Sequence, residues 1–413
     1  MNRKIITVVA LGMLLVSCVI SNQKYDESSA DIHDALENKN LISIDLDKLK
    51  TDTTIHTSEI FKKVKTIILE TNKDNLIGRI NSFQVFKDTI FILDSDRSKG
   101  LYLFNMNGKY LRKIGSVGQG PGEYNKPIDF TIDKINRWIY IVDFSGGKIL
   151  KYDLKSGKYI KNLYTKRNKQ ETYSIQCVGE KLFGDLYEYP YISENSLLQE
   201  LNTFDGEHEK KWLSSWKYHK KISDVQLLGS KFYDRNQDAP KFIQTFMDVF
   251  MTFDKKGNVM PYLELKSNNL LSTDDLAKLE GNKFMQMSSF INSGKIFYFQ
   301  SLVTSKNLVY LEYRQKIYMK HLLYNTATKK TRLAYGLTDD LVFDTSHNLP
   351  PILVSTDFRC ATADGFISVI DPSAMTSFIK QVKAGRLAKN LDKRDQLMKL
   401  NADANPVIFV YSN

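Results

Sequence analysis

The sequence contains little cysteine, little proline and no apolar run long enough to span a bilayer. Three of the 413 residues are cysteine and nine are proline, which excludes a disulfide scaffold and a collagen-like chain. The apolar run Ile5–Val16 is shorter than the roughly 20 residues of a spanning helix. Material for a core is plentiful, because 42% of the residues are hydrophobic and 25% are charged. This balance indicates a folded globular protein.

The N-terminus has the pattern of a secretion signal. Arg3 and Lys4 precede the apolar run, which ends in Leu-Val-Ser-Cys at residues Leu15–Cys18. These four residues resemble the lipobox of bacterial lipoproteins, in which the cysteine becomes the mature N-terminus and carries the lipid. The resemblance implies a lipoprotein signal peptide over residues 1–17, lipid attachment at Cys18 and a body outside the cytoplasm. An ordinary cleaved signal is the alternative.

The residues that follow Cys18 are polar up to about residue 40. We therefore expect a flexible tether and lead-in over residues 18–56, and a single folded domain over residues 57–413. Acyl chains on a cysteine anchor a protein stably when more than one is attached. Val19 stands where an aspartate would, by resemblance to bacterial sorting rules, favour the inner membrane. The expected location is the cell envelope at the outer membrane, with the leaflet left open.

A repeat of about 49 residues, with the residue types of β-strands, follows the tether. The segment Ile90–Asp94 matches Ile139–Asp143, and Gly108–Leu111 matches Gly157–Ile160, both at an offset of 49 residues. Short β-branched and aromatic runs alternate with Asp, Asn, Ser and Gly clusters, which is typical of strands joined by hairpins. A strand-rich repeat of this length predicts propeller blades. The turn glycines of the repeat are Gly108, Gly157, Gly206 and Gly257, at spacings of 49, 49 and 51 residues.

One segment of the repeat carries a family resemblance. Residues Gly115–Tyr124 read Gly-Ser-Val-Gly-Gln-Gly-Pro-Gly-Glu-Tyr, and Pro127, Ile141–Asp143 and Tyr152–Asp153 follow. This pattern resembles an NHL-type repeat, and in particular the six-bladed β-propeller lipoproteins of Bacteroidetes-type bacteria. The match covers roughly residues 76–164 and implies the fold more than a detailed function. The arginine of NHL repeats is absent, and Lys148 stands nearest to its place.

The predicted fold is an all-β, six-bladed propeller of four-stranded antiparallel blades, with short helical insertions and a helical segment before the C-terminal strand. An open ring would leave unpaired edges, so Val64–Glu70 is expected to pair with the last blade. Ser272–Asp275 has the form of a capping box, and Pro372 begins a second helix. The apolar stripe of that helix, predicted to pack on the propeller, consists of Met375, Phe378, Ile379 and Val382.

Catalytic motifs are not apparent. The six histidines show no metal-ligand spacing, and no Gly-x-Ser-x-Gly motif occurs. The spacing of these residues therefore indicates no cofactor. An enzyme acting in the central channel of the propeller would need a divalent metal. Asp94, Asp143 and Asp185 recur near the ends of second strands, which favours turn formation over metal binding. Cys177 and Cys360 are expected as two buried free thiols, with one disulfide as the alternative.

Strand order predicts which loops share one end of the propeller. The loop between two blades and the loop between the second and third strands of a blade lie on the same rim. Loops on a rigid scaffold concentrate binding residues, and basic groups there suit acidic ligands. The candidate binding residues on this rim are Arg97, Lys99, Gln119, Glu123, Tyr124, Lys148, Lys166, Arg167 and Lys169.

Two functions remain open from the sequence. The first is a membrane-anchored envelope protein for binding or scaffolding, whose rim engages an acidic glycan, a peptide or a protein partner. The second is a metal-dependent propeller hydrolase or lyase, similar to lactonases, acting in the central channel. The absence of a catalytic motif favours the first. The net charge of +11 is modest for this length, and the expected compartment disfavours nucleic acid as a partner. The oligomeric state is not indicated.

Overall fold

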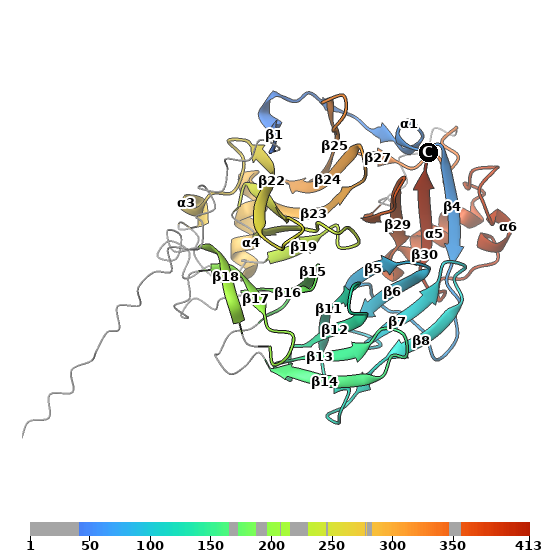
Figure 1. Cartoon of the computed structure of the whole chain (residues 1–413). Helices are drawn as coiled ribbons and strands as arrows, with labels where there is room; N and C mark the ends of the chain where they lie inside the picture. The colour runs from blue at the N-terminus through green and yellow to red at the C-terminus, as the bar shows by residue number, and fades with distance from the viewer. Residues whose placement is uncertain are drawn as a thin grey trace, which may run out of the picture.

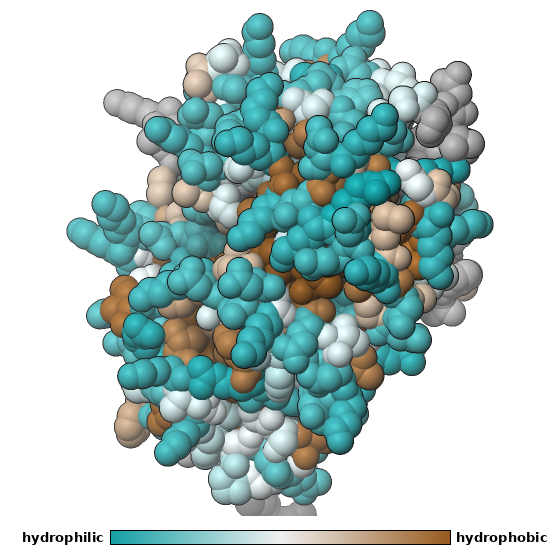
Figure 2. All heavy atoms as spheres, turned by 90° about the vertical axis from the view of Figure 1, so that its right-hand side faces the viewer, coloured by the Kyte–Doolittle hydropathy of each residue, from teal (hydrophilic) through white to brown (hydrophobic). Residues whose placement is uncertain are grey.

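The computed structural model describes residues 41–164, 172–186, 196–206, 208–214, 230–244, 247–276, 278, 283–346 and 357–413. Over these residues the chain forms a six-bladed β-propeller of four-stranded antiparallel blades around one central axis (Figure 1). In each blade the strands follow one another from the axis outwards. The outer wall around blades 1 and 6 is mostly hydrophilic, with smaller hydrophobic areas between (Figure 2). The predicted fold class is confirmed.

The strands of the six blades, from the innermost outwards, have the following bounds. Blade 1 consists of β5 (Ser82–Phe86), β6 (Thr89–Asp94), β7 (Gly100–Asn105) and β8 (Tyr110–Ile114); blade 2 of β11 (Pro127–Asp133), β12 (Trp138–Asp143), β13 (Lys148–Asp153) and β14 (Tyr159–Tyr164); blade 3 of β15 (Ile175–Val178), β16 (Lys181–Asp185), β17 (Ser196–Leu201) and β18 (His208–Ser214). Blade 4 consists of β19 (Ser230–Tyr233), β20 (Lys241–Gln244), β21 (Val249–Phe253) and β22 (Val259–Lys266); blade 5 of β23 (Ile296–Thr304), β24 (Leu308–Gln315), β25 (Tyr318–Asn325) and β26 (Thr331–Ala334); blade 6 of β28 (Phe358–Ala361), β29 (Phe366–Ile370), β30 (Val407–Ser412) and β4 (Lys63–Ile68).

The alternation of apolar residues within a strand explains how the blades pack. In β6, Phe91 and Leu93 belong to the cluster between blades 1 and 2. Ile90 and Ile92 face the other way and belong to the cluster between blades 1 and 6. Successive side chains of a strand point to opposite faces, so a strand that is apolar at every position is stable only between two neighbouring sheets.

The repeated glycines occupy the turn between the third and fourth strands. Gly108 has φ of +89° and Gly157 has φ of +72°, a conformation that glycine adopts without steric cost. At Gly108 a side chain would also collide with the carbonyl oxygen of Ile68, 2.0 Å from the position of a Cβ atom. The turn therefore lets blade 1 approach the end of β4 in blade 6.

The ring closes with strands from both ends of the chain. Strand β4 pairs antiparallel with β30, in a register that places Ile67 opposite Ile408 and Lys65 opposite Val410. Blade 6 thus combines one N-terminal strand with three C-terminal strands (Figure 1). The predicted closure through Val64–Glu70 is confirmed.

The part of the lead-in that the structure describes is ordered, which differs from the flexible segment expected up to residue 56. Strand β1 (Ile42–Asp45) pairs parallel with β22, and β2 (Thr51–Asp52) pairs parallel with β26. Between them lies a short 3-10 helix, η2 (Leu46–Lys48). Strand β3 (Ile55–His56) then pairs with β27 (Leu337–Thr338) and leads into α1 (Thr57–Ile60). We call residues 41–56 the strap, because they cover the outer edges of blades 4 and 5.

The helices lie outside the blades. Besides α1, the described residues form α3 (Thr273–Leu276), α4 (Lys283–Ser293), α5 (Pro372–Lys383) and α6 (Arg394–Leu397). The predicted capping box is present, since Asp275 accepts from the backbone N–H of Ser272 at 3.0 Å and donates its own N–H to the Ser272 hydroxyl at 3.1 Å. The predicted apolar stripe of α5 is buried. In the described residues, none of the helices is long and apolar enough to cross a membrane.

Candidate ligand-binding site

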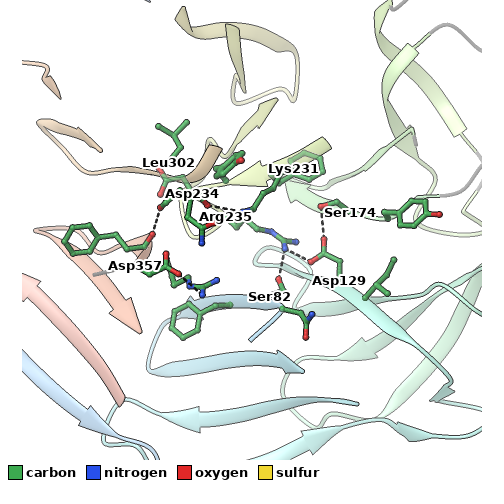
Figure 3. A pocket seen from close by; sticks show the side chains of 18 residues that line it. Ser82, Asp129, Ser174, Lys231, Asp234, Arg235, Leu302 and Asp357 are labelled. Carbon is green, nitrogen blue, oxygen red and sulfur yellow. Dashed lines mark hydrogen bonds and ion pairs between the residues drawn. The ribbon is translucent and has the colours of Figure 1, made fainter. Parts of the chain in front are cut away.

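A cavity of about 270 Å³ lies at the end of the central channel where the inner strands begin. Residues of the innermost strand of each blade, or residues that directly precede it, contribute to its wall (Figure 3). We call this cavity the channel mouth. Its polar and charged lining residues are Asn81, Ser82, Asp129, Tyr173, Ser174, Lys231, Asp234, Arg235, Gln300, Ser301, Asp357 and Arg359.

The connection between β19 and β20 closes the channel below this mouth. Asn236 accepts a hydrogen bond from the backbone N–H of Val85 in β5 at 2.9 Å. Its carbonyl accepts another from the Lys134 ammonium at 2.7 Å. Asp234 accepts from the backbone N–H of Thr304 in β23 at 3.1 Å and from the hydroxyl of the same residue. These contacts fix residues 234–240, which we call the plug, to blades 1, 2 and 5.

Arg235 of the plug uses all five of its N–H donors inside the protein. Its Nε donates to the Gln176 side chain at 2.9 Å, and its Nη1 donates to the Ser82 hydroxyl at 2.8 Å and to Asp129 at 2.5 Å. Its Nη2 donates to the backbone carbonyls of Phe130 and Ile175. Figure 3 shows the guanidinium between Ser82 and Asp129. A guanidinium has five donors, so Arg235 has a structural role at the floor of the mouth.

Lys231 differs from Arg235, because most of its hydrogen-bonding capacity is unused. Its ammonium donates to the carbonyl of Gln300 at 3.1 Å and lies 4.8 Å from the centre of the Tyr233 ring. The side chain is exposed to the cavity although protein surrounds it. Loss of hydration in this enclosed place, together with the nearby Arg359 guanidinium, lowers the pKa of Lys231 to about 8. At neutral pH it remains mainly a cation with two free donors.

The part of the mouth formed by blade 6 carries an ion pair, and a buried carboxyl group of blade 5 lies near it. Arg359 contacts Asp357 at 2.7 Å. Behind them, Glu312 of β24 is 2% exposed, and its Oε2 atom has no hydrogen-bond partner. Burial and the neighbouring Asp357 raise the pKa of Glu312 to about 8. Glu312 is therefore mainly uncharged at neutral pH and adds no negative charge beside this ion pair.

The recurring aspartates hold turns, as expected. Asp94 accepts backbone hydrogen bonds from Gly78 and Arg97 at 2.8 and 2.9 Å. Asp143 accepts from Lys126 at 2.9 Å, and Asp185 accepts from Tyr173 at 2.7 Å. Each carboxylate thus ties the end of a second strand to the segment leading into the inner strand. In the described residues, no group of three or more His, Cys, Asp or Glu side chains is placed to hold a metal ion.

The predicted rim residues fall into three groups, and no described member lines the channel mouth. Tyr124 is fully buried, and its hydroxyl donates to the Ile114 carbonyl at 2.8 Å, so it has no surface to offer a ligand. Lys148 donates to the Glu123 carbonyl at 3.0 Å, and the Glu123 carboxylate accepts from Gly120 at 2.8 Å. These three residues stabilise the loop that contains strands β9 (Ser116–Val117) and β10 (Glu123–Tyr124).

The second group keeps exposed surface at the predicted end of the propeller. Arg97 and Gln119 are exposed, and Lys99 is partly exposed. The third group, consisting of Lys166, Arg167 and Lys169, lies outside the described residues. The remaining candidate, Cys18, also lies outside them.

The predicted rim lies at the same end of the propeller as the channel mouth, but the prediction did not include the residues that line the mouth. Lys231, Asp357 and Arg359 belong to blades 4 and 6, where the repeat is no longer recognisable. The available signal was a charged residue at the start of an inner strand, which is otherwise hydrophobic. Without the blade boundaries that signal could not be separated from ordinary surface charge.

Both cysteines of the folded domain are free thiols. Burial raises the pKa of Cys177 and of Cys360, which makes both thiols poor nucleophiles. Cys177 lines a second cavity, of about 430 Å³, at the opposite end of the channel, beyond the plug. The plug residues Gln237 and Asp238 also line this second cavity.

Comparison with solved structures agrees with this architecture. A Bacteroides fragilis protein that is expected, by its name, to be exported has 16% sequence identity and a TM-score of 0.67, over 90% of this chain and 100% of that chain. A DUF4221 family member from Bacteroides vulgatus has 10% identity and a TM-score of 0.51, over 86% and 97% of the two chains. At these identities the likeness shows the fold alone.

Comparison at the level of sequence places the chain in a family. No curated protein matches it. A family model with the description "Domain of unknown function (DUF4934)" matches residues 41–412, which include the strap as well as all six blades. The chain therefore belongs to the DUF4934 family.

Proposed function

We propose that this protein is a lipid-anchored binding protein of the cell envelope and that it receives its ligand at the channel mouth. The observation that carries the proposal is the Lys231 ammonium, which lines the cavity at the channel mouth and uses one of its three donors on the protein. Concave sites with a few convergent polar groups are the usual form of ligand sites. Six strands of a closed ring form the wall, so the site is rigid before any ligand binds.

A bulky side chain at the mouth tests this proposal. Gln300 lines the channel mouth, and Lys255 lines the cavity at the opposite end. The variants Gln300→Trp and Lys255→Trp would be compared with the wild type on arrays of glycans and acidic peptides. We expect Gln300→Trp to weaken binding at least tenfold and Lys255→Trp to bind as the wild type does. Equal binding by all three proteins would reject the channel mouth as the site.

The exposed rim residues are proposed as an outer part of the same binding face. Arg97, Lys99 and Gln119 lie on loops at the end of the propeller that carries the channel mouth. Exposed charges contribute little singly, so their effect should be on the association rate and its salt dependence. Charge reversal at Lys99 should slow association in dilute salt. An unchanged association rate would remove the rim from the binding face.

The anchor and a location outside the cytoplasm are proposed from the leader sequence. Cys18 would carry the lipid at the outer membrane. The full chain, expressed in a bacterium supplied with an alkyne-labelled fatty acid, should take up the label and sediment with membranes. Cys18→Ser should lose both properties. A labelled Cys18→Ser variant, or an unlabelled wild type with an intact leader, would refute lipidation at this residue.

A further inference from the structure

We propose that the channel mouth binds an anionic sugar residue of an acidic glycan and that Lys231 forms the ion pair with its carboxylate or sulfate group. This inference rests on the proposed function and specifies the ligand of the same site. Three observations support it: the charge balance of the cavity, an aromatic pair in its wall, and inner-strand backbone groups that already have hydrogen-bond partners.

The charge balance leaves one cation for a ligand. Arg235 is paired with Asp129 and Arg359 with Asp357. Asp234 accepts hydrogen bonds from the backbone and the hydroxyl of Thr304. Its charge is offset by the nearby ammonium of Lys241, a buried residue that does not line the mouth. Among the described residues that line the mouth, Lys231 remains as the cation that contacts a carbonyl and an aromatic ring instead of a carboxylate. An ammonium in an enclosed site interacts more strongly with an anion than one on an open surface.

The wall beside this cation offers an aromatic surface. Tyr173 lines the mouth, and its ring centre lies 4.8 Å from that of Phe144, with a tilt of 38° between the rings. Both residues are partly exposed, and the Lys126 ammonium lies 5.4 Å from the centre of the Phe144 ring. Rings that combine an apolar face with a polar edge suit ligands that are partly apolar and partly hydrated. A pyranose ring, with its C–H faces and hydroxyl edge, is such a ligand.

The size and polarity of the cavity fit one sugar residue. A volume of about 270 Å³ equals the space of roughly nine water molecules at ~30 Å³ each. Gln300 supplies an amide group whose oxygen accepts from the Tyr298 hydroxyl at 2.6 Å and whose N–H donors have no such contact among the described residues. Ser174 supplies a hydroxyl group that donates to Asp129 at 2.9 Å and can still accept. Such groups hydrogen-bond to sugar hydroxyls as donors and as acceptors. The rest of the polymer would leave through the open end.

The strand edges at the mouth disfavour an acidic peptide as the ligand. A peptide commonly joins a sheet edge through unpaired backbone groups. Here side chains from neighbouring elements already satisfy such groups of the inner strands. The Asp129 carboxylate accepts from the N–H of Ile175 at 3.0 Å. The Tyr233 hydroxyl donates to the carbonyl of Phe299 at 2.6 Å.

The test compares anionic and neutral forms of the same sugar. Oligogalacturonate, its methyl ester, a sulfated oligosaccharide and an acidic peptide would be titrated into the mature chain by calorimetry. We expect at least one anionic oligosaccharide to bind and the methyl ester to bind more weakly. A hydrogen bond between charged groups contributes about 1.5–3 kcal/mol, so Lys231→Met should weaken the binding of the anionic sugar about 10- to 100-fold.

The control removes an equal charge elsewhere. Lys256 is exposed in the turn between β21 and β22, at the opposite end of the propeller, and Lys256→Met should bind as the wild type does. Thermal unfolding would verify that both variants fold, and Lys231→Gln would replace Lys231→Met if the latter did not. The carboxylated and sulfated probes show which anionic group is preferred.

Several results would overturn the inference. Equal affinity for galacturonate and its methyl ester would exclude the ion pair, as would an unchanged affinity of Lys231→Met. Failure of both anionic oligosaccharides to bind would exclude the glycan. If the peptide or a neutral sugar bound instead and Gln300→Trp abolished that binding, the proposed function would survive and the inference would fail. If Gln300→Trp had no effect on a ligand that binds, the proposed function itself would fail.

Discussion

At the scale of single residues, side chains rather than backbone contacts join the inner strands across the channel. Arg235 connects the plug with inner strands of blades 1, 2 and 3 through Ser82, Asp129 and Ile175. The paired Asp129 is 5% exposed. Removing one partner of a buried ion pair leaves the other charge without compensation, which is costly in free energy.

We predict that Arg235→Ala lowers the free energy of unfolding by about 3–5 kcal/mol. Arg235→Lys should recover little of this free energy, because an ammonium has three donors instead of five and lacks the planar geometry of a guanidinium. Denaturation in guanidinium chloride measures both variants. As a matched control, Arg79→Ala removes an exposed ion pair with Asp96 at 2.8 Å and should cost less than about 1 kcal/mol. Similar losses in Arg235→Ala and Arg79→Ala would contradict the structural role of Arg235.

A second prediction at this scale concerns pH and Glu312. Its pKa is raised from 4.5 to about 8 in the folded protein. Between these values the folded state keeps a proton that the unfolded state has released, so this carboxyl group makes stability fall as the pH rises from about 4.5 to 8. Glu312→Gln cannot titrate. The free energy of unfolding of Glu312→Gln, relative to that of the wild type, should therefore increase as the pH rises from 5 to 9.

Thermal unfolding at several pH values measures this difference. Glu180→Gln, at an exposed position, serves as the control and should run parallel to the wild type. A stability difference between Glu312→Gln and the wild type that stays constant with pH would show that Glu312 is not protonated in the folded protein.

At the scale of secondary-structure elements, the strap covers edges that would otherwise be open. Strands β1 and β2 pair with the outermost strands of blades 4 and 5. The strap also buries Ile44, Leu46 and Ile55, which are 4%, 6% and 1% exposed. Covered edges cannot pair with other chains, so the strap contributes to solubility as well as to stability.

We predict that a chain starting at residue 57 unfolds at a lower temperature than one starting at residue 41. Full burial of an aliphatic side chain contributes about 1.5–3 kcal/mol, and such values are upper estimates. The expected loss is on the order of 3 kcal/mol, with increased self-association. A chain starting at residue 72 lacks β4 as well and should not fold. Equal melting temperatures for the chains from residues 41 and 57 would show that the strap adds no stability.

At the scale of the whole molecule, the ring depends on the pairing of β4 with β30. This pairing joins residues more than 300 positions apart in the sequence, since Lys65 lies opposite Val410. Most other strand pairs of the propeller join neighbours in sequence. The closing pair therefore determines whether six sheets form a ring or an open row with two free edges.

A disulfide across this pair should stabilise the ring. Opposite residues in an antiparallel pair have Cα atoms about 4.5–5.5 Å apart, within the range that a disulfide spans. Lys65→Cys combined with Val410→Cys should, when oxidised, raise the free energy of unfolding by roughly 2–4 kcal/mol over the reduced form. The two native thiols are buried or partly buried with raised pKa values and should not interfere. A difference near zero would mean that unfolding does not begin at the closure.

The propeller fold could be predicted from the sequence because its causes are local. Successive apolar residues in β6 and β12 require a sheet on each side, and the glycines between the third and fourth strands of blades 1 to 4 mark the repeat. The capping box at Ser272 and the apolar stripe of α5 are likewise patterns within a few residues. The strap was not predicted, because two- to four-residue strands that pair with distant edges leave no periodic signal.

The channel mouth was decided by the tertiary structure alone. Lys231, Asp129 and Asp357 are far apart in the sequence and meet only because the ring brings the inner strands to one axis. Whether a charged side chain there is paired or free depends on its neighbours from other blades, as the contrast between Arg235 and Lys231 shows. Local sequence determines that a blade forms and where it turns. Burial and charge pairing across blades determine which of its side chains can bind a ligand, and these depend on contacts that the chain makes only when the ring is closed.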